Sequence, residues 1–191
     1  YKKITKKEKN SLKEKKYIYG FVSNGAYDLI KNDKLTGINF GIIKSFAKFA
    51  NIDMDYNDAY LSYDELIKDF EKGKVDLFYL NGKYNTKKDY FKTIQAIESE
   101  VVVLMNVNNP IYVSDINELK NYDILTVKNS YIDVYLKKIG CKTKTYNTID
   151  KLLANTSKDS VIAIDLENYE YYKGNSLINF KIAYQFYLED K

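Results

Sequence analysis

The regular alternation of strand and helix signals most constrains what this chain can fold into. Short apolar runs typical of strands alternate with segments whose apolar residues recur at helical spacing. The expected strands are residues 17–22, 53–57, 75–80, 123–127, 142–146 and 160–164. The expected helices are residues 37–50, 62–72, 114–120, 130–139, 148–155 and 166–172. Such alternation predicts an α/β fold made of two doubly wound lobes.

The same pattern predicts the domain organisation. We expect a basic leader at residues 1–16, lobe one at 17–106, lobe two at 107–183 and a return hinge strand at 184–191. A β-rich stretch joins the lobes without a Gly/Ser linker, and its apolar run at residues 101–105 is expected in the interior. The crossings near Asn106 and Tyr184 would act as hinge strands.

The first long helix, residues 37–50, has a clear apolar side. That side holds Ile38, Ile42, Phe46, Phe49 and Ala50 at helical spacing. Lys44 and Lys48 point away from it. This is the pattern typical of a helix with one apolar face.

The residue types that are absent exclude several kinds of chemistry. The chain has no histidine, and all 30 of its basic residues are lysine. A Ser-His-Asp or Cys-His relay and an imidazole metal site are therefore excluded, as is bidentate arginine recognition of a carboxylate or phosphate. The single cysteine, Cys141, cannot form an internal disulfide. We expect no enzyme activity, no cofactor and no metal site.

Positive charge is concentrated in the leader. Residues 1–16 carry a local charge of +6, against +4 for the whole chain, so the rest of the chain carries −2. A lysine run with little aromatic interleaving favours a solvated segment, and no nucleic-acid partner is expected. No apolar run approaches the ~20 residues that span a bilayer, and the leader has no signal-peptide core. Whether a leader or anchor was removed before Tyr1 is left open.

Five segments carry short motifs in a fixed order. They are Lys-Leu-Thr-Gly-Ile-Asn at 34–39, Phe-Glu-Lys-Gly-Lys-Val-Asp-Leu at 70–77, Asn-Thr-Lys-Lys at 85–88, the stretch 118–130 that ends in Lys-Asn-Ser, and Val-Ile-Ala-Ile-Asp at 161–165 with tyrosines downstream. In this order they resemble the Venus-flytrap, type II extracellular solute-binding domains (bacterial family 3-like). The resemblance covers residues 4 to about 190 and implies a ligand held between two lobes joined by hinge strands.

The two ends of the chain suggest a subtype of this family. Residues 4–13 are similar to the segment that precedes such domains in membrane sensor proteins, although an ordinary capped helix explains them too. Residues 180–188 resemble the strand that returns to lobe one, but the family's closing lobe-one helix is absent after Lys191. Lobe one is therefore expected to be incomplete at the C-terminus, with an apolar patch through which the isolated chain could form a homodimer.

The resemblance implies an extracytoplasmic, small-molecule-binding sensor domain of a membrane signalling protein. Its membrane anchor would lie in segments outside this chain. The alternative is a solute-binding protein of an ABC importer. A lyase or dehydratase on the same fold is a much weaker possibility, because the sequence shows no paired acid in an apolar run.

In doubly wound lobes, ligands bind beyond the carboxyl ends of the strands. The candidate ligand-binding residues in the loops at these ends are Asn24, Tyr27, Asn81, Lys83, Tyr84, Lys88, Asn129, Ser130, Tyr131, Asp165 and Tyr169. Several have competing structural explanations. Ser130 and Asp165 could each cap a helix, and many of the 20 tyrosines must lie on the surface.

Three of these residues suggest a ligand class. By the resemblance, Asp165 would take a ligand amino group, and Ser130 at a helix start would face a negative end. Lys88 stands where amino-acid-binding relatives have an arginine, and lysine cannot form the two-point bond to a carboxylate. We therefore expect an amine-bearing or polar metabolite rather than a simple α-amino acid.

Overall fold

The computed structural model describes residues 5–79 and 100–188. The chain divides into two compact units. Unit 1 comprises Tyr1–Ser23 and Tyr27–Tyr79, and unit 2 comprises Asn24–Ala26 and Leu80–Lys191. Each unit combines a β-sheet with helices, so the expected α/β class is confirmed.

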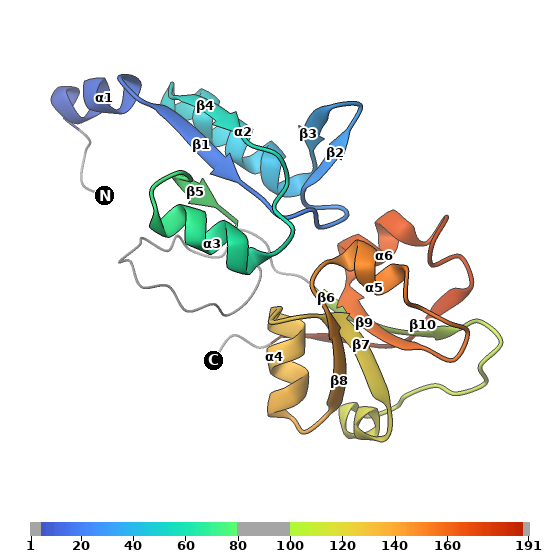
Figure 1. Ribbon diagram of the computed structural model, residues 1–191. Coiled ribbons are helices and arrows are strands. Elements are labelled where there is room, and N and C mark those ends of the chain that lie inside the picture. Colours follow the sequence, from blue (N-terminus) through green and yellow to red (C-terminus); the bar gives the residue numbers. More distant parts are fainter. Residues whose placement is uncertain (1–4, 80–99, 189–191) are drawn as a thin grey trace. The chain divides into compact units, whose positions relative to one another are not determined.

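Unit 1 is built on a small parallel sheet with the strand order β4-β1-β5 (Figure 1). Its elements are α1 (Lys6–Lys13), β1 (Lys16–Gly20), β2 (Leu29–Lys31), β3 (Lys34–Thr36), α2 (Ile38–Ala50), β4 (Asp53–Tyr56), α3 (Tyr63–Glu71) and β5 (Leu77–Phe78). The core of the unit is aromatic: Tyr19 and Phe21 are buried, and Phe40 and Tyr56 pack against them.

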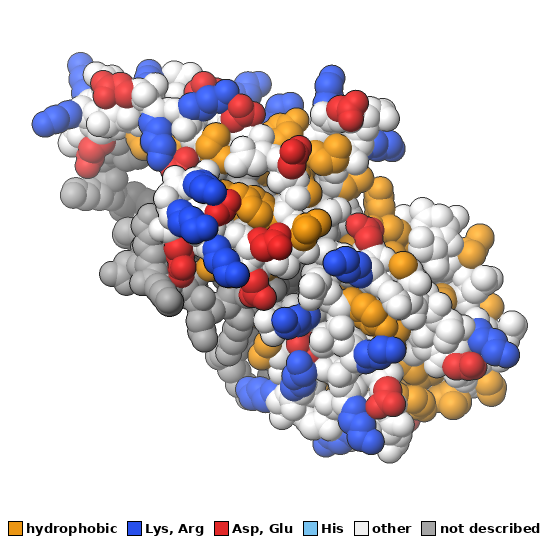
Figure 2. Space-filling model, viewed as in Figure 1, with side chains coloured by type: hydrophobic (Ala, Val, Ile, Leu, Met, Phe, Trp, Pro, Cys, Tyr) orange, Lys and Arg blue, Asp and Glu red, His pale blue; other side chains and the backbone are white. Residues whose placement is uncertain are grey.

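The leader forms a short capped helix, α1. Thr5 accepts a hydrogen bond from the Glu8 amide, and the Glu8 carboxylate accepts one from the Thr5 amide, which completes a capping box. The structural explanation of this segment, an ordinary capped helix, therefore holds. On the face drawn in Figure 2, lysine side chains are interspersed with acidic ones.

A short hairpin, β2–β3, was not expected from the sequence. Its two turn residues, Asn32 and Asp33, have φ angles of 51° and 58°. A two-residue hairpin turn with positive φ at both central residues is a type I′ turn, whose twist matches that of the flanking strands. Asn and Asp tolerate positive φ angles. The flanking strands have three residues each, which is too short for alternation to be recognised.

The apolar side of α2 that the sequence shows faces solvent. Its four large members, Ile38, Ile42, Phe46 and Phe49, are 38%, 37%, 52% and 90% exposed. The opposite side packs inward, through buried Asn39 and Ala47 and partly buried Phe40 and Ile43. Both sides of this helix carry apolar residues, so helical spacing alone could not identify the inner face.

Unit 2 contains a five-stranded mixed sheet with the order β10-β6-β9-β7-β8 (Figure 1). Its elements are β6 (Glu100–Asn106), the 3-10 helix η1 (Ile116–Asn121), β7 (Asp123–Val127), α4 (Tyr131–Lys138), β8 (Lys142–Tyr146), α5 (Ile149–Leu153), β9 (Val161–Asp165), α6 (Leu166–Tyr172) and β10 (Phe180–Tyr187). Strands β8, β7 and β9 are parallel, whereas β6 runs antiparallel to β9 and β10. The domain boundaries expected at residues 106 and 183 stay a prediction.

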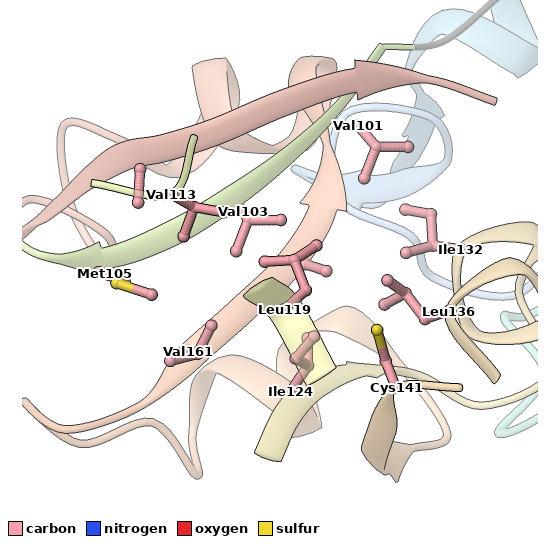
Figure 3. Packing of buried hydrophobic residues seen from close by; sticks show 12 residues of the cluster. Val101, Val103, Met105, Val113, Leu119, Ile124, Ile132, Leu136, Cys141 and Val161 are labelled. Carbon is pink, nitrogen blue, oxygen red and sulfur yellow. The ribbon is translucent and has the colours of Figure 1, made fainter. Parts of the chain in front are cut away.

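Both faces of this sheet are covered by apolar packing. Val101, Val103 and Met105 contribute to the core on one face (Figure 3), and Val102 and Leu104 contribute to the core on the other. All five are 0% exposed, which confirms the interior location expected for residues 101–105. A strand covered on both faces reads as a continuous apolar run rather than an alternating one.

Candidate functional site

A small cavity in unit 2 lies at the carboxyl ends of β7 and β9. Five polar residues line it: Asn24, Thr126, Ser130, Asp165 and Asn168. The apolar part of the lining is Val127, Ile132, Ile149, Ala163 and Ile164. The space for the centre of a water-sized group is ≈ 10 Å³, which is roughly the room that one small polar group needs.

Asp165 is the charged residue among the described residues that line the cavity. It ends β9 and caps α6, because its Oδ1 accepts a hydrogen bond of 2.9 Å from the Asn168 amide. Its Oδ2 accepts a second bond of 3.0 Å from the Asn168 side chain. The residue is 8% exposed. Burial raises the pKa of the Asp165 carboxyl above its usual range, although the Asn168 hydrogen bonds act in the opposite direction.

Asn168 links Asp165 to the short segment Asn24–Ala26, which belongs to unit 2. Its Oδ1 accepts a hydrogen bond of 3.0 Å from the Ala26 amide, and its Nδ2 lies 3.4 Å from Asn24 Oδ1. Gly25 has a φ of 52°, and a Cβ there would come within 2.1 Å of Asn168 Oδ1. The close approach of this segment therefore requires glycine.

Ser130 sits at the start of α4, on a tightly held loop. Its Oγ accepts a hydrogen bond of 3.1 Å from the Asp133 amide and caps the helix. Asp133, which is 1% exposed, accepts in turn from the Asn129 amide at 3.0 Å, from Thr143 Oγ1 at 2.8 Å and from Lys137 Nζ at 2.9 Å. Asn129 has a φ of 58°. The buried carboxylate thus fixes the turn that presents Ser130.

Three of the expected ligand-binding residues meet at this cavity: Asn24, Ser130 and Asp165. Ser130 and Asp165 also cap helices. Each of them therefore has a structural role in addition to lining the cavity. The ligand-binding assignment of all eleven expected residues stays a prediction.

The other expected residues lie elsewhere or outside the described ranges. Asn129 and Tyr131 flank Ser130 but do not line the cavity. Tyr169 packs against the core of unit 2, and Tyr27 is buried in unit 1. The remaining candidates, Asn81, Lys83, Tyr84 and Lys88, lie outside the described residues.

Two polar lining residues, Thr126 and Asn168, were not among the residues expected from the sequence. Thr126 interrupts the apolar run Ile124–Val127 with a hydroxyl, but the sequence does not reveal whether that hydroxyl finds a partner within the protein. Asn168 follows Asp165 by three residues. At this spacing the side chain of a helix N-cap accepts a hydrogen bond from a backbone amide.

The cavity is suited to a group that donates hydrogen bonds. Among the described residues, its lining holds one carboxylate, two hydroxyls and two amides, and no lysine. Within residues 5–79 and 100–188, no group of three or more metal-ligating side chains is placed to hold a metal ion. In the same ranges, no helix has both the length and the apolar character needed to cross a membrane.

Several solved structures share this fold at low sequence identity. The VFT2 domain of BvgS from Bordetella pertussis, a double mutant, gives a TM-score of 0.74 at 12% identity over 97% of this chain and 82% of that chain. An ancestral arginine-binding protein bound to arginine gives 0.70 at 16% identity over 92% and 81%. The substrate-binding protein of an amino acid ABC transporter gives 0.67 at 17% identity over 89% and 78%.

No protein-family model and no curated protein matches the chain. The likeness therefore rests on structure, and at these identities it speaks to the fold alone. It agrees with the order of motifs along the chain and with the α/β architecture of both units. This chain has the fold of the type II solute-binding, or Venus-flytrap, domains.

Proposed function

We propose that this chain is an extracytoplasmic ligand-binding domain that takes the amine-bearing end of a small molecule into the cavity of unit 2. The observation that carries the proposal is the convergence of a buried carboxylate, Asp165, with two hydroxyls in a cavity that no basic side chain from residues 5–79 or 100–188 lines. A buried carboxylate without a cationic partner is costly, and a ligand ammonium would compensate its charge.

The expected role of the domain is that of a sensor module in a membrane signalling protein. This role is supported by the likeness to the BvgS domain. Ligand binding would shift an equilibrium between open and closed arrangements of the two lobes, as differential affinity requires. Catalysis is not part of the proposal.

A binding protein of an ABC importer is the second candidate. It is supported by the likeness to the amino acid transporter's binding protein and to the arginine-binding proteins. The coding sequence that follows Lys191 discriminates between the two roles: a transmembrane helix with a cytoplasmic output domain favours the sensor, and its absence favours the importer.

The ligand class is tested by a thermal-shift screen of the full chain. The amine-bearing probes are L-arginine, L-glutamine, agmatine and putrescine, and the probes without an amine are glucose and succinate. A ligand that binds the folded state raises the melting temperature with concentration. We expect at least one amine-bearing probe to do so and the amine-free probes to have no effect.

A matched pair of variants ties the effect to the cavity. Asp165→Asn keeps a cap acceptor for α6 but removes the charge, so it should weaken binding roughly 10- to 100-fold, the worth of a hydrogen bond to a charged group. Asp115→Asn makes the same change at the cap of η1, away from the cavity, and should leave affinity unchanged. If no amine shifts the wild-type melting temperature, or both variants bind equally well, the proposal is wrong.

A further inference from the structure

We propose that the hydroxyl of Thr126 forms a hydrogen bond with the bound ligand. This contact would make the cavity selective for a group that carries several polar hydrogens. This inference rests on the proposed function. Thr126 lines the cavity and is 1% exposed, and its Oγ1 has no hydrogen-bond partner among residues 5–79 and 100–188. A buried hydroxyl without a hydrogen-bond partner is rare, because it loses its hydrogen bonds to water on folding and gains none within the protein.

Packing does not require a hydroxyl at this position. Side chains alternate across a strand, so Thr126 shares a face of β7 with Ile124, which lies in the core on that face. That core otherwise consists of aliphatic and sulfur-containing residues such as Val101 and Ala163. Valine has nearly the shape of threonine and would fill the same space without an unpaired polar atom.

The neighbouring strand shows how a threonine hydroxyl is satisfied in this unit. Thr143 on β8 is paired with Ile124 on β7, and its Oγ1 donates to Asp133 at 2.8 Å. Asn39 Oδ1 and Tyr146 Oη also lack partners within the described ranges, but neither residue lines the cavity. Thr126 therefore combines an unpaired polar atom with a place in the lining.

The chemistry of the lining defines the group that fits. A hydroxyl can accept a hydrogen bond, and the Asp165 carboxylate in the same lining accepts further ones. A primary ammonium has three N–H donors, so it can satisfy Thr126 and Asp165 together. A trimethylammonium has none, and it is too large for a space that admits one water-sized group. Primary amines should be selected over their N-methylated forms.

The test compares Thr126→Val, Thr126→Ser and Thr143→Val in the full chain, by melting and by titration calorimetry. The titrants are the amine probe with the largest wild-type thermal shift among L-arginine, L-glutamine, agmatine and putrescine, and its N-trimethylated form. Thr126→Val should bind the amine at least tenfold more weakly, and Thr126→Ser within threefold of wild type. Thr126→Val should melt about 2–4 °C higher, whereas Thr143→Val should melt about 2–4 °C lower.

The outcomes separate this inference from the proposed function. If Thr126→Val melts at a lower temperature than wild type, as Thr143→Val is expected to do, the Thr126 hydroxyl has a partner within the protein. The inference is then overturned. If Thr126→Val binds the amine as tightly as wild type, the inference fails while the proposed function stands. If no amine probe shifts the wild-type protein, the proposed function fails and this inference fails with it.

Discussion

The Tyr19 hydroxyl lies 3.1 Å from each carboxylate oxygen of Asp28, in the interior of unit 1. Both residues are almost fully buried, at 0% and 3% exposed. Asn39 Nδ2 donates a further hydrogen bond of 2.8 Å to Asp28 Oδ2. Among the described residues, the groups that act on this carboxyl are thus neutral, and a buried carboxylate with neutral partners holds a proton more readily than one in water.

The stability of unit 1 should therefore fall as pH rises from about 4 to about 7. Burial raises the pKa of Asp28 to about 7, against hydrogen bonds from Asn39, Tyr19 and the Phe40 backbone that lower it. The folded state then holds the proton more tightly than the unfolded chain. The contribution of Asp28 protonation to the free energy of unfolding is complete below the pKa that Asp28 has in the unfolded chain. It falls by up to about 1.4 kcal/mol per pH unit as pH rises, and it levels off above about 7.

Asp28→Asn isolates this effect because it keeps the shape of the side chain but cannot ionise. Urea unfolding of both proteins between pH 4.5 and 8 should give a difference in free energy that grows with pH in favour of the variant. Asp33→Asn, in the hairpin turn, is the control and should follow wild type. A difference that does not change with pH would show that Asp28 does not carry the proton.

The exposure of the apolar side of α2 leads to a second prediction. Phe49→Ala should change the free energy of unfolding by less than about 0.5 kcal/mol, because the side chain is 90% exposed. Phe21→Ala, in the core of the same unit and 2% exposed, should cost about 3–5 kcal/mol. Chemical denaturation measures both. A loss of several kcal/mol at Phe49 would mean that this side of α2 is packed in solution.

Asp133 should be the most costly carboxylate to remove from unit 2. Asp133→Ala takes an acceptor from the Asn129 amide and from Thr143 Oγ1, and the cost should be on the order of 2–4 kcal/mol. Thr143→Val removes one of these bonds and should cost less. Equal losses in the two variants, measured by urea unfolding, would contradict the role of Asp133 as the shared acceptor.

The sequence predicts the regular parts of the fold well, because burial on one or both faces leaves a periodic trace. The bounds expected for β7, β8 and α6 are those of the structure. The β2–β3 hairpin was missed because its strands are too short to show alternation, and its turn uses Asn and Asp rather than glycine. The inner face of α2 could not be identified from the sequence because apolar residues lie on both sides of the helix.

The site was harder to predict than the fold. Asp165 and Ser130 could be identified because they follow strands, where loops meet at one edge of a sheet. Thr126 could not, because the sequence does not reveal whether a strand hydroxyl finds a partner. That depends on contacts such as the one between Thr143 and Asp133, which join separate elements.

The most direct test of the proposed function is an amide chemical-shift titration of the ¹⁵N-labelled full chain with the amine probe that gives the largest wild-type thermal shift. We expect saturable shifts concentrated at the cavity, at Thr126, Ser130, Asp165 and Asn168, and their loss in Asp165→Asn. Shifts confined to residues away from this lining, or shifts that survive unchanged in Asp165→Asn, would contradict an amine-binding site at the carboxyl ends of β7 and β9.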